Sequence, residues 1–109
     1  MTVSELQTAL SLTPVTLPEG DREVTGAYVG DLLSWVMGRA QSDHAWLTIM
    51  SNLNIVAVAT LSDVACILLC EGVTPDESVR ATAETKGVNI LSTEMTAYEA
   101  AKHLAELGL

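Results

Sequence analysis

Hydrophobic and polar positions alternate in blocks along the chain from Ala45 to its end. Apolar runs of five or six residues at 45–50, 65–70 and 88–92 are each followed by a longer, more mixed segment. Such runs are typical of buried strands, and the segments between them suit helices of about 10–12 residues. The pattern therefore predicts an α/β fold with βα repeats and a mostly parallel sheet of about four strands, counting a short strand expected at 23–25.

Helix start and stop signals support this division. Thr74, followed by proline and by an acid three residues later, is expected to cap a helix that ends at Gly87. Thr96 and Glu99 form a second capping box for the last helix. Asp31 precedes the segment LLSWVMGRA and is expected to cap a helix there.

The segment NLNIVAVATLS, residues 52–62, is apolar on nearly every side. Its β-branched residues would also suit a strand. We interpret it as a buried helix, because the strands on either side need a crossover in order to run parallel. A helix apolar all round indicates a covering partner, and the two tryptophans are interpreted as core or interface anchors. The expected interface of a homodimer comprises Ile55, Val58, Trp35 and Trp46.

The first 19 residues carry weaker signals. A short helix is expected over 4–10, and Pro14, Pro18 and Gly20 predict irregular or short extended structure with a turn at 18–21. We therefore take residues 1–19 as an N-terminal helix and lead-in to a single domain formed by residues 20–109.

The charge of the chain limits its partners. Fourteen acids against five bases give a net charge of −9, and the bases are scattered. Nucleic acids and anionic membranes both require a basic surface, so neither partner is expected. The most apolar stretch, residues 55–70, is interrupted by polar residues and is shorter than the ~20 residues of a membrane span. The first ten residues do not resemble a signal peptide, which predicts a cytoplasmic location.

Motifs for catalysis, cofactors and metals are missing from the sequence. There is no GxxxxGK[ST] phosphate loop, no GxGxxG, no GxSxG and no CxxC or HxxxH pair. Cys66 and Cys70 are interpreted as small apolar thiols of the core, with a redox role for Cys70 as the alternative. We expect no enzymatic activity, no catalytic residue, no cofactor and no metal site.

The strand ends are where a ligand would bind. In open α/β sheets, ligands lie beyond the carboxyl ends of the parallel strands, here 51–54, 71–74 and 92–94. Ser51 and Asn52 could cap the following helix, or leave its free N–H groups to an anion. The candidate ligand-binding residues are Ser51, Asn52, Asn54, Glu71, Gly72 and Thr93.

Three stretches of the chain resemble a known family. GAYVGDLLSWVM at 26–37, AWLTIMSNLNIVAVATLSDVACILLCEG at 45–72 and KGVNILSTEMTAYEAAKHL at 86–104 are together similar to the DRTGG domain, over roughly residues 20–107. Small stand-alone members are often described as related to the N-terminal domain of HPr kinase/phosphorylase. The resemblance implies a three-layer α/β/α sandwich and a regulatory role. It also implies an anaerobic bacterial setting, because stand-alone members tend to be encoded near iron–iron hydrogenases and their electron-transfer partners. Kinase activity is not implied, since that chemistry belongs to a separate P-loop domain.

The chain departs from the family at its signatures. TGG is absent, and GDR occurs only at 20–22, away from the position expected for it; SNLN at 51–54 and CEG at 70–72 stand approximately where the two signatures would fall. Close relatives carry Gln and His where this chain has Met50 and Asn52, which puts an inherited ligand in doubt. We therefore expect a non-catalytic regulatory or interaction module that works as a homodimer. The alternative is a sensor of a nucleotide or other small anion at the strand ends.

Overall fold

A five-stranded sheet forms the centre of the structure, a computed structural model that describes all 109 residues. The sheet has the order β1-β5-β4-β3-β2. The pairs β2–β3, β3–β4 and β4–β5 are parallel, and β1 joins the edge antiparallel to β5. A mostly parallel sheet is thus confirmed, with one strand more than expected. The strands are β1 (Thr13–Thr16), β2 (Gly26–Val29), β3 (His44–Thr48), β4 (Cys66–Leu69) and β5 (Ile90–Ser92).

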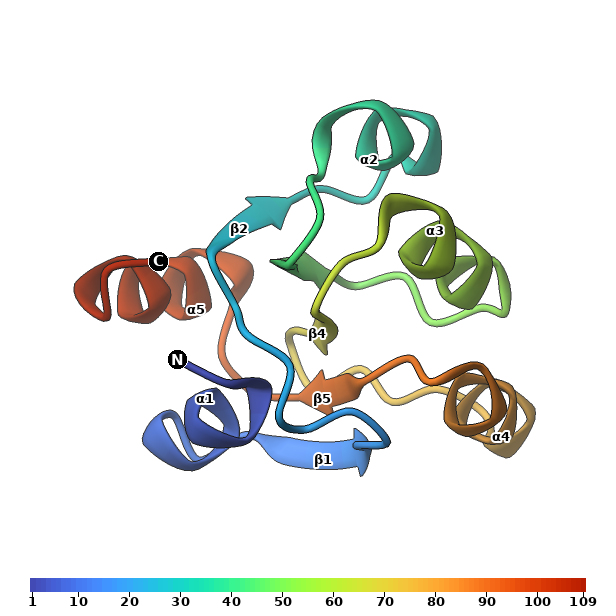
Figure 1. Cartoon of the computed structure of the whole chain (residues 1–109), viewed down its shortest axis with the longest axis horizontal. Coiled ribbons are helices and arrows are strands. Elements are labelled where there is room, and N and C mark those ends of the chain that lie inside the picture. The colour runs from blue at the N-terminus through green and yellow to red at the C-terminus, as the bar shows by residue number, and fades with distance from the viewer.

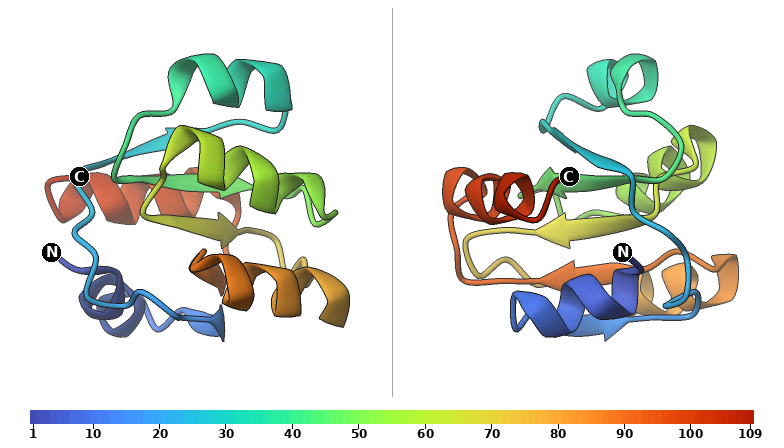
Figure 2. Two further views of the ribbon diagram at one scale, coloured as in Figure 1. Left: turned by 45° about the vertical axis from the view of Figure 1, so that its right-hand side comes forward. Right: turned by 60° about the vertical axis from the view of Figure 1, so that its left-hand side comes forward.

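Five helices cover the two faces of the sheet and complete the three-layer sandwich (Figures 1 and 2). Helices α2, α3 and α4 lie on one face, and α1 and α5 lie on the other. Each of α2, α3 and α4 connects two neighbouring parallel strands, and crossovers of one hand place all three on the same side. The helices are α1 (Val3–Ala9), α2 (Leu33–Arg39), α3 (Asn54–Ser62), α4 (Glu77–Lys86) and α5 (Ala97–Glu106).

The core consists of two apolar clusters, one on each side of the sheet. Strand β4 supplies both, because successive side chains of a strand point to opposite faces. Cys66 and Leu68 belong to the cluster that includes residues of α1 and α5, whereas Ile67 and Leu69 belong to the cluster beneath α2, α3 and α4. This double burial explains the uninterrupted apolar run at 65–70.

Two of the predicted helix signals are confirmed and two are wrong. Thr96 and Glu99 form the reciprocal capping box of α5, and Gly87 ends α4 at a φ of 72°. Helix α4, however, begins at Glu77 after Asp76 and not after Thr74. Asp31 does not cap α2, because its carboxylate accepts hydrogen bonds from residues at the end of β3 instead.

The N-terminal segment is built into the same sheet and core. Helix α1 forms close to the expected position, and Pro14 lies in the edge strand β1, where a missing N–H costs little. The strand expected at 23–25 is wrong: only Glu23 forms an isolated bridge, to Thr2, and the strand itself is β2.

Asn89 fastens the turn at 18–21 to the sheet. Its side chain is 1% exposed, and its amide donates hydrogen bonds to the carbonyls of Glu19 and Ala65, both at 2.9 Å. Its oxygen accepts a third from the N–H of Glu19, also at 2.9 Å. A buried amide with these three partners is satisfied and rigidly placed, so Asn89 has a structural role.

Candidate functional site

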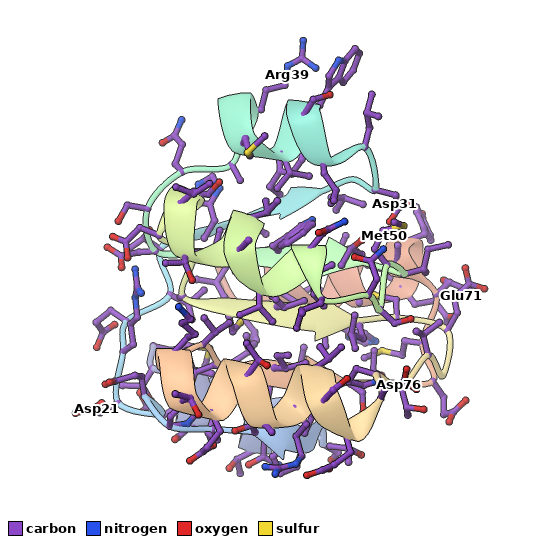
Figure 3. All side chains as sticks on the ribbon, turned by 90° about the vertical axis from the view of Figure 1, so that its right-hand side faces the viewer. Asp21, Asp31, Arg39, Met50, Glu71 and Asp76 are labelled. Atoms are coloured by element: carbon purple, nitrogen blue, oxygen red, sulfur yellow. The ribbon has the colours of Figure 1, made fainter.

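The carboxyl ends of the parallel strands meet at one edge of the molecule, called here the carboxyl edge. It consists of the loops at 30–32, 49–53, 70–76 and 93–96, which follow β2, β3, β4 and β5. Figure 3 shows the labelled side chains of Asp31, Met50, Glu71 and Asp76 along this edge. All six predicted ligand-binding residues lie at or beside these loops, on three neighbouring strands.

The residues after β3 are engaged in starting α3. The side-chain oxygen of Asn52 accepts a hydrogen bond from the N–H of Asn54 at 3.0 Å, and the Asn52 carbonyl accepts one from Ile55 at 3.2 Å. Asn52 and Asn54 are exposed, and Ser51 is half-buried. This local turn occupies the oxygen of Asn52 without capping α3, whose N-cap residue is Leu53, and the NH₂ group of Asn52 remains available to a ligand.

The residues after β4 and β5 form a second group. The N–H groups of Glu71 and Gly72 donate to the carbonyls of Met95 and Thr93, at 2.8 and 2.9 Å, so the two loops lie against each other. Gly72 has a φ of 73°, and a Cβ there would approach a carboxylate oxygen of Glu94 to 2.6 Å. Glycine is thus favoured by the backbone conformation, whereas the exposed Glu94 side chain could move aside for a Cβ.

Asp31 connects the loop after β2 to the end of β3. Its carboxylate accepts a hydrogen bond from the Thr48 hydroxyl at 2.7 Å and another from the Ile49 N–H at 3.0 Å. Sequence reasoning missed this role, because the partners lie 17 and 18 residues away. The exposed carboxylate of Asp31 therefore lies at the end of β3, beside the candidate residues that follow this strand.

The electrostatic character of the carboxyl edge is acidic. Burial, and then the nearby carboxylates of Asp31 and Glu71, raise the pKa of the Cys70 thiol to about 11. Asp76 and Glu94 add two further exposed carboxylates to the loops. The N-cap residue of α4, Asp76, makes no side-chain cap, so the first N–H groups of the helix are free to attract an anion. The nearby carboxylates counteract that attraction. A bare anion is therefore less favoured here than the strand topology alone suggests.

The structure contains no group of three or more His, Cys, Asp or Glu side chains placed to hold a metal ion. No helix combines the length and the apolar character that crossing a membrane requires.

Three of the four residues predicted for the interface are buried within the chain, so the prediction is wrong for them. Ile55 and Trp46 are fully buried and Val58 is 5% exposed, because all three point into the core beneath α2, α3 and α4. The indole N–H of Trp46 donates to the Gly30 carbonyl at 2.8 Å. Only Trp35, 55% exposed on α2, is open to a partner, and the Arg39 guanidinium lies over its ring at 3.6 Å.

A different set of apolar side chains is exposed on α3. Leu53, Ala57 and Leu61 are spaced by four residues and form one stripe along the outside of the helix, which we call the α3 ridge. Leu53 is 51% exposed and Leu61 is 75% exposed. A groove of about 360 Å³ runs beside the ridge, between α3 and α4, lined by Leu53, Val56, Ala57, Thr60, Leu61, Thr82 and Lys86. The four-residue spacing was the available signal, but all the positions from 55 to 59 are apolar as well and obscure it.

Comparison with known proteins identifies a family and a related structure. The model of the DRTGG domain matches residues 35–107, about two thirds of the chain. No curated protein is similar enough in sequence to match. A similar fold occurs in the CBS and DRTGG domains of the regulatory region of Clostridium perfringens pyrophosphatase, solved in complex with its activator diadenosine tetraphosphate. The TM-score is 0.72 at 13% identity, over 93% of this chain and 44% of that one.

Proposed function

This chain belongs to the DRTGG domain family, and we propose that it is a regulatory domain that performs no catalysis itself and works as a homodimer. The observation that carries the proposal is the exposed α3 ridge with its groove. An exposed apolar surface of this kind is a liability in a monomer and is typical of an interaction site. The activity of HPr kinase/phosphorylase, to whose N-terminal domain the chain is similar, requires a phosphate loop, and this sequence contains none.

Self-association is tested by sedimentation equilibrium between 1 and 100 μM. We expect a mass of twice 11.5 kDa at the upper end of this range, because association would bury the exposed leucines of both ridges. A mass that stays at one chain throughout would contradict the homodimer. The regulatory role would then have to depend on a different partner.

A second candidate function is the sensing of a nucleotide at the carboxyl edge. Two observations favour it: the related C. perfringens regulatory region binds diadenosine tetraphosphate, and the start of α4 has no side-chain cap. A helix N-terminus with free N–H groups favours phosphate, whereas Asp31 and Glu71 oppose it. A nucleotide bound here would therefore approach the start of α3, which carries no acid, more readily than the start of α4, where Asp76 and Glu77 stand.

Nucleotide binding is tested by thermal unfolding with adenine nucleotides and dinucleoside polyphosphates. A ligand at 100 times its Kd adds about 2.7 kcal/mol, a shift of several degrees in a domain of this size. Asn52→Ala should reduce that shift, because it removes an exposed side-chain amide just before the start of α3. Thr8→Ala, an exposed change on α1 at the opposite face, is the control. Identical melting with every nucleotide would exclude this function.

The family resemblance adds a biological setting to the proposal. Stand-alone members are associated with iron–iron hydrogenases and electron transfer, and we propose the same setting for this chain. No residue of the carboxyl edge or of the α3 ridge argues for that setting, so it rests on the resemblance.

A further inference from the structure

We propose that the α3 ridge is the contact surface for a second copy of this chain, with the two α3 helices packed antiparallel about a two-fold axis near Ala57. This inference rests on the proposed homodimer and specifies its surface and orientation. Leu53 and Leu61 lie at the two ends of the ridge and are left in solvent by the single chain. The smaller Ala57 between them allows two helices to approach closely.

Charge is divided unevenly between the helical layer that carries the ridge and the rest of the molecule. Helices α2, α3 and α4 hold three bases, Arg39, Arg80 and Lys86, against two acids, Glu77 and Glu84, a net charge of +1. The rest of the chain holds the other 12 acids and two bases, a net charge of −10. Two copies that each carry −9 repel one another, so this layer is the face that they can bring together at the lowest electrostatic cost.

The centre of this layer is uncharged. No Asp, Glu, Lys or Arg occurs between Asp43 and Asp63, and α3 lies between α2 and α4 (Figure 3). A strongly charged partner would find no complementary side chain along the ridge, whereas a second uncharged ridge matches it. Specific interfaces likewise have an apolar centre and a polar rim.

The charges of α4 favour the antiparallel orientation. Glu77, which also pairs with Arg80 of its own helix, begins α4 and Lys86 ends it, so two antiparallel copies of α4 place each acid opposite the partner's base. If the two layers ran parallel, α2 of one copy would face α4 of the other, and Arg39 and Lys86 would meet at the same end. Neither base has an ion pair within its own chain.

The dimensions of the layer also fit a second copy. A standard interface takes about 800 Å² from each partner. The chain measures 32 × 26 × 24 Å, so one complete face has an area of that order. The groove between α3 and α4, about 360 Å³, can receive Leu61 of the other copy.

The location is tested with Leu61→Glu and a matched control, Tyr98→Glu. Leu61 is 75% exposed on α3, and Tyr98 is 79% exposed on α5 at the opposite face, so neither change disturbs the core. In sedimentation equilibrium we expect Leu61→Glu to weaken the dimer at least about 100-fold, since each dimer buries two copies of this leucine. Tyr98→Glu should leave the dissociation constant unchanged. Equal dissociation constants for the wild type and Leu61→Glu would overturn the inference.

The orientation is tested with single cysteine substitutions and mild oxidation. About the proposed axis, the Ala57→Cys variant should form an intermolecular disulfide. The Leu61→Cys variant should not, because its two copies lie about 12 Å apart at ~1.5 Å per residue. The native thiols of Cys66 and Cys70 are fully buried and do not compete. Crosslinking of Leu61→Cys without Ala57→Cys would contradict the antiparallel arrangement.

These results separate the two proposals. A monomeric wild type contradicts the homodimer itself. A wild-type dimer that is unaffected by Leu61→Glu leaves the homodimer standing and refutes only its assignment to the α3 ridge.

Discussion

Replacing Trp46 with alanine is expected to lower the free energy of unfolding by about 4 kcal/mol. The indole is fully buried in the cluster that also contains Val36 of α2 and Ile55 of α3. Alanine would leave a cavity beneath both helices and would remove the donor to the Gly30 carbonyl, now at 2.8 Å. Urea unfolding followed by circular dichroism, at one fixed protein concentration, measures the loss.

A second substitution separates a core role from an interface role. Trp46→Phe keeps most of the buried ring but loses the indole N–H, so a cost of about 1–2 kcal/mol is expected. The dimer dissociation constant should stay the same in a folded Trp46→Phe protein, because the side chain has no exposed surface. A stable Trp46→Ala protein with weakened association would instead restore Trp46 to the interface that the sequence suggested.

Most of the strands and helices after residue 44 were predictable because they have a strong local signal. Strand β4 is a continuous apolar run, β3 and β5 are largely apolar, and α5 carries both halves of a capping box. Strand β2 is the four residues GAYV, which lie only partly buried at the edge of the sheet and have no strong local signal of their own. Its position depends on pairing with β3, in which Ala27 lies beside Ala45, and a contact between distant segments leaves no periodic trace.

The site was predictable in its place and not in its details. The βα repeat was sufficient to bring Asn52, Glu71 and Thr93 to one edge, because parallel strands end together. The inner and outer sides of α3 could not be distinguished, since an apolar residue stands at almost every position of 53–61. Ile55 and Val58 were therefore expected at an interface, whereas the exposed side of α3 is the one with Ala57 and Leu61.

The two proposed activities belong to different parts of the surface: nucleotide binding to the acidic carboxyl edge, and self-association to the near-neutral layer of α2, α3 and α4. A nucleotide at the edge has to overcome the carboxylates of Asp31 and Glu71, whereas a second copy at α3 meets none. Helix α3 starts at the edge with Asn54 and carries the ridge along its length. A ligand that orders the start of α3 would therefore act on the dimer surface through a single rigid helix.

The two buried thiols are expected to make the fold sensitive to alkaline pH. Burial raises the pKa of Cys66 from 9.0 to about 12, and burial with nearby carboxylates raises that of Cys70 to about 11. Below pH 9 both thiols are protonated whether the chain is folded or unfolded, so stability is unaffected. Above pH 9 the unfolded chain loses these protons first, and stability falls until the pH passes the folded pKa values.

The expected loss is large enough to measure. Between pH 8 and 10.5 each thiol should remove about 2 kcal/mol from the free energy of unfolding, or about 4 kcal/mol together. The double variant Cys66→Ala, Cys70→Ala should lose that much less than the wild type over the same range, and comparing the two removes every contribution that does not come from the thiols. Urea titrations at the two pH values give all four free energies.

The same thiols decide whether a redox role is available to this chain. A thiolate is the reactive form, and a thiol with a pKa of 11 or more is almost wholly protonated at pH 8. Both cysteines should therefore react with a disulfide reagent only as fast as the native chain opens, and at once in urea. Rapid modification of one thiol in the native state, together with equal alkaline losses in the wild type and the double variant, would refute the burial argument and return Cys70 to consideration as a reactive group.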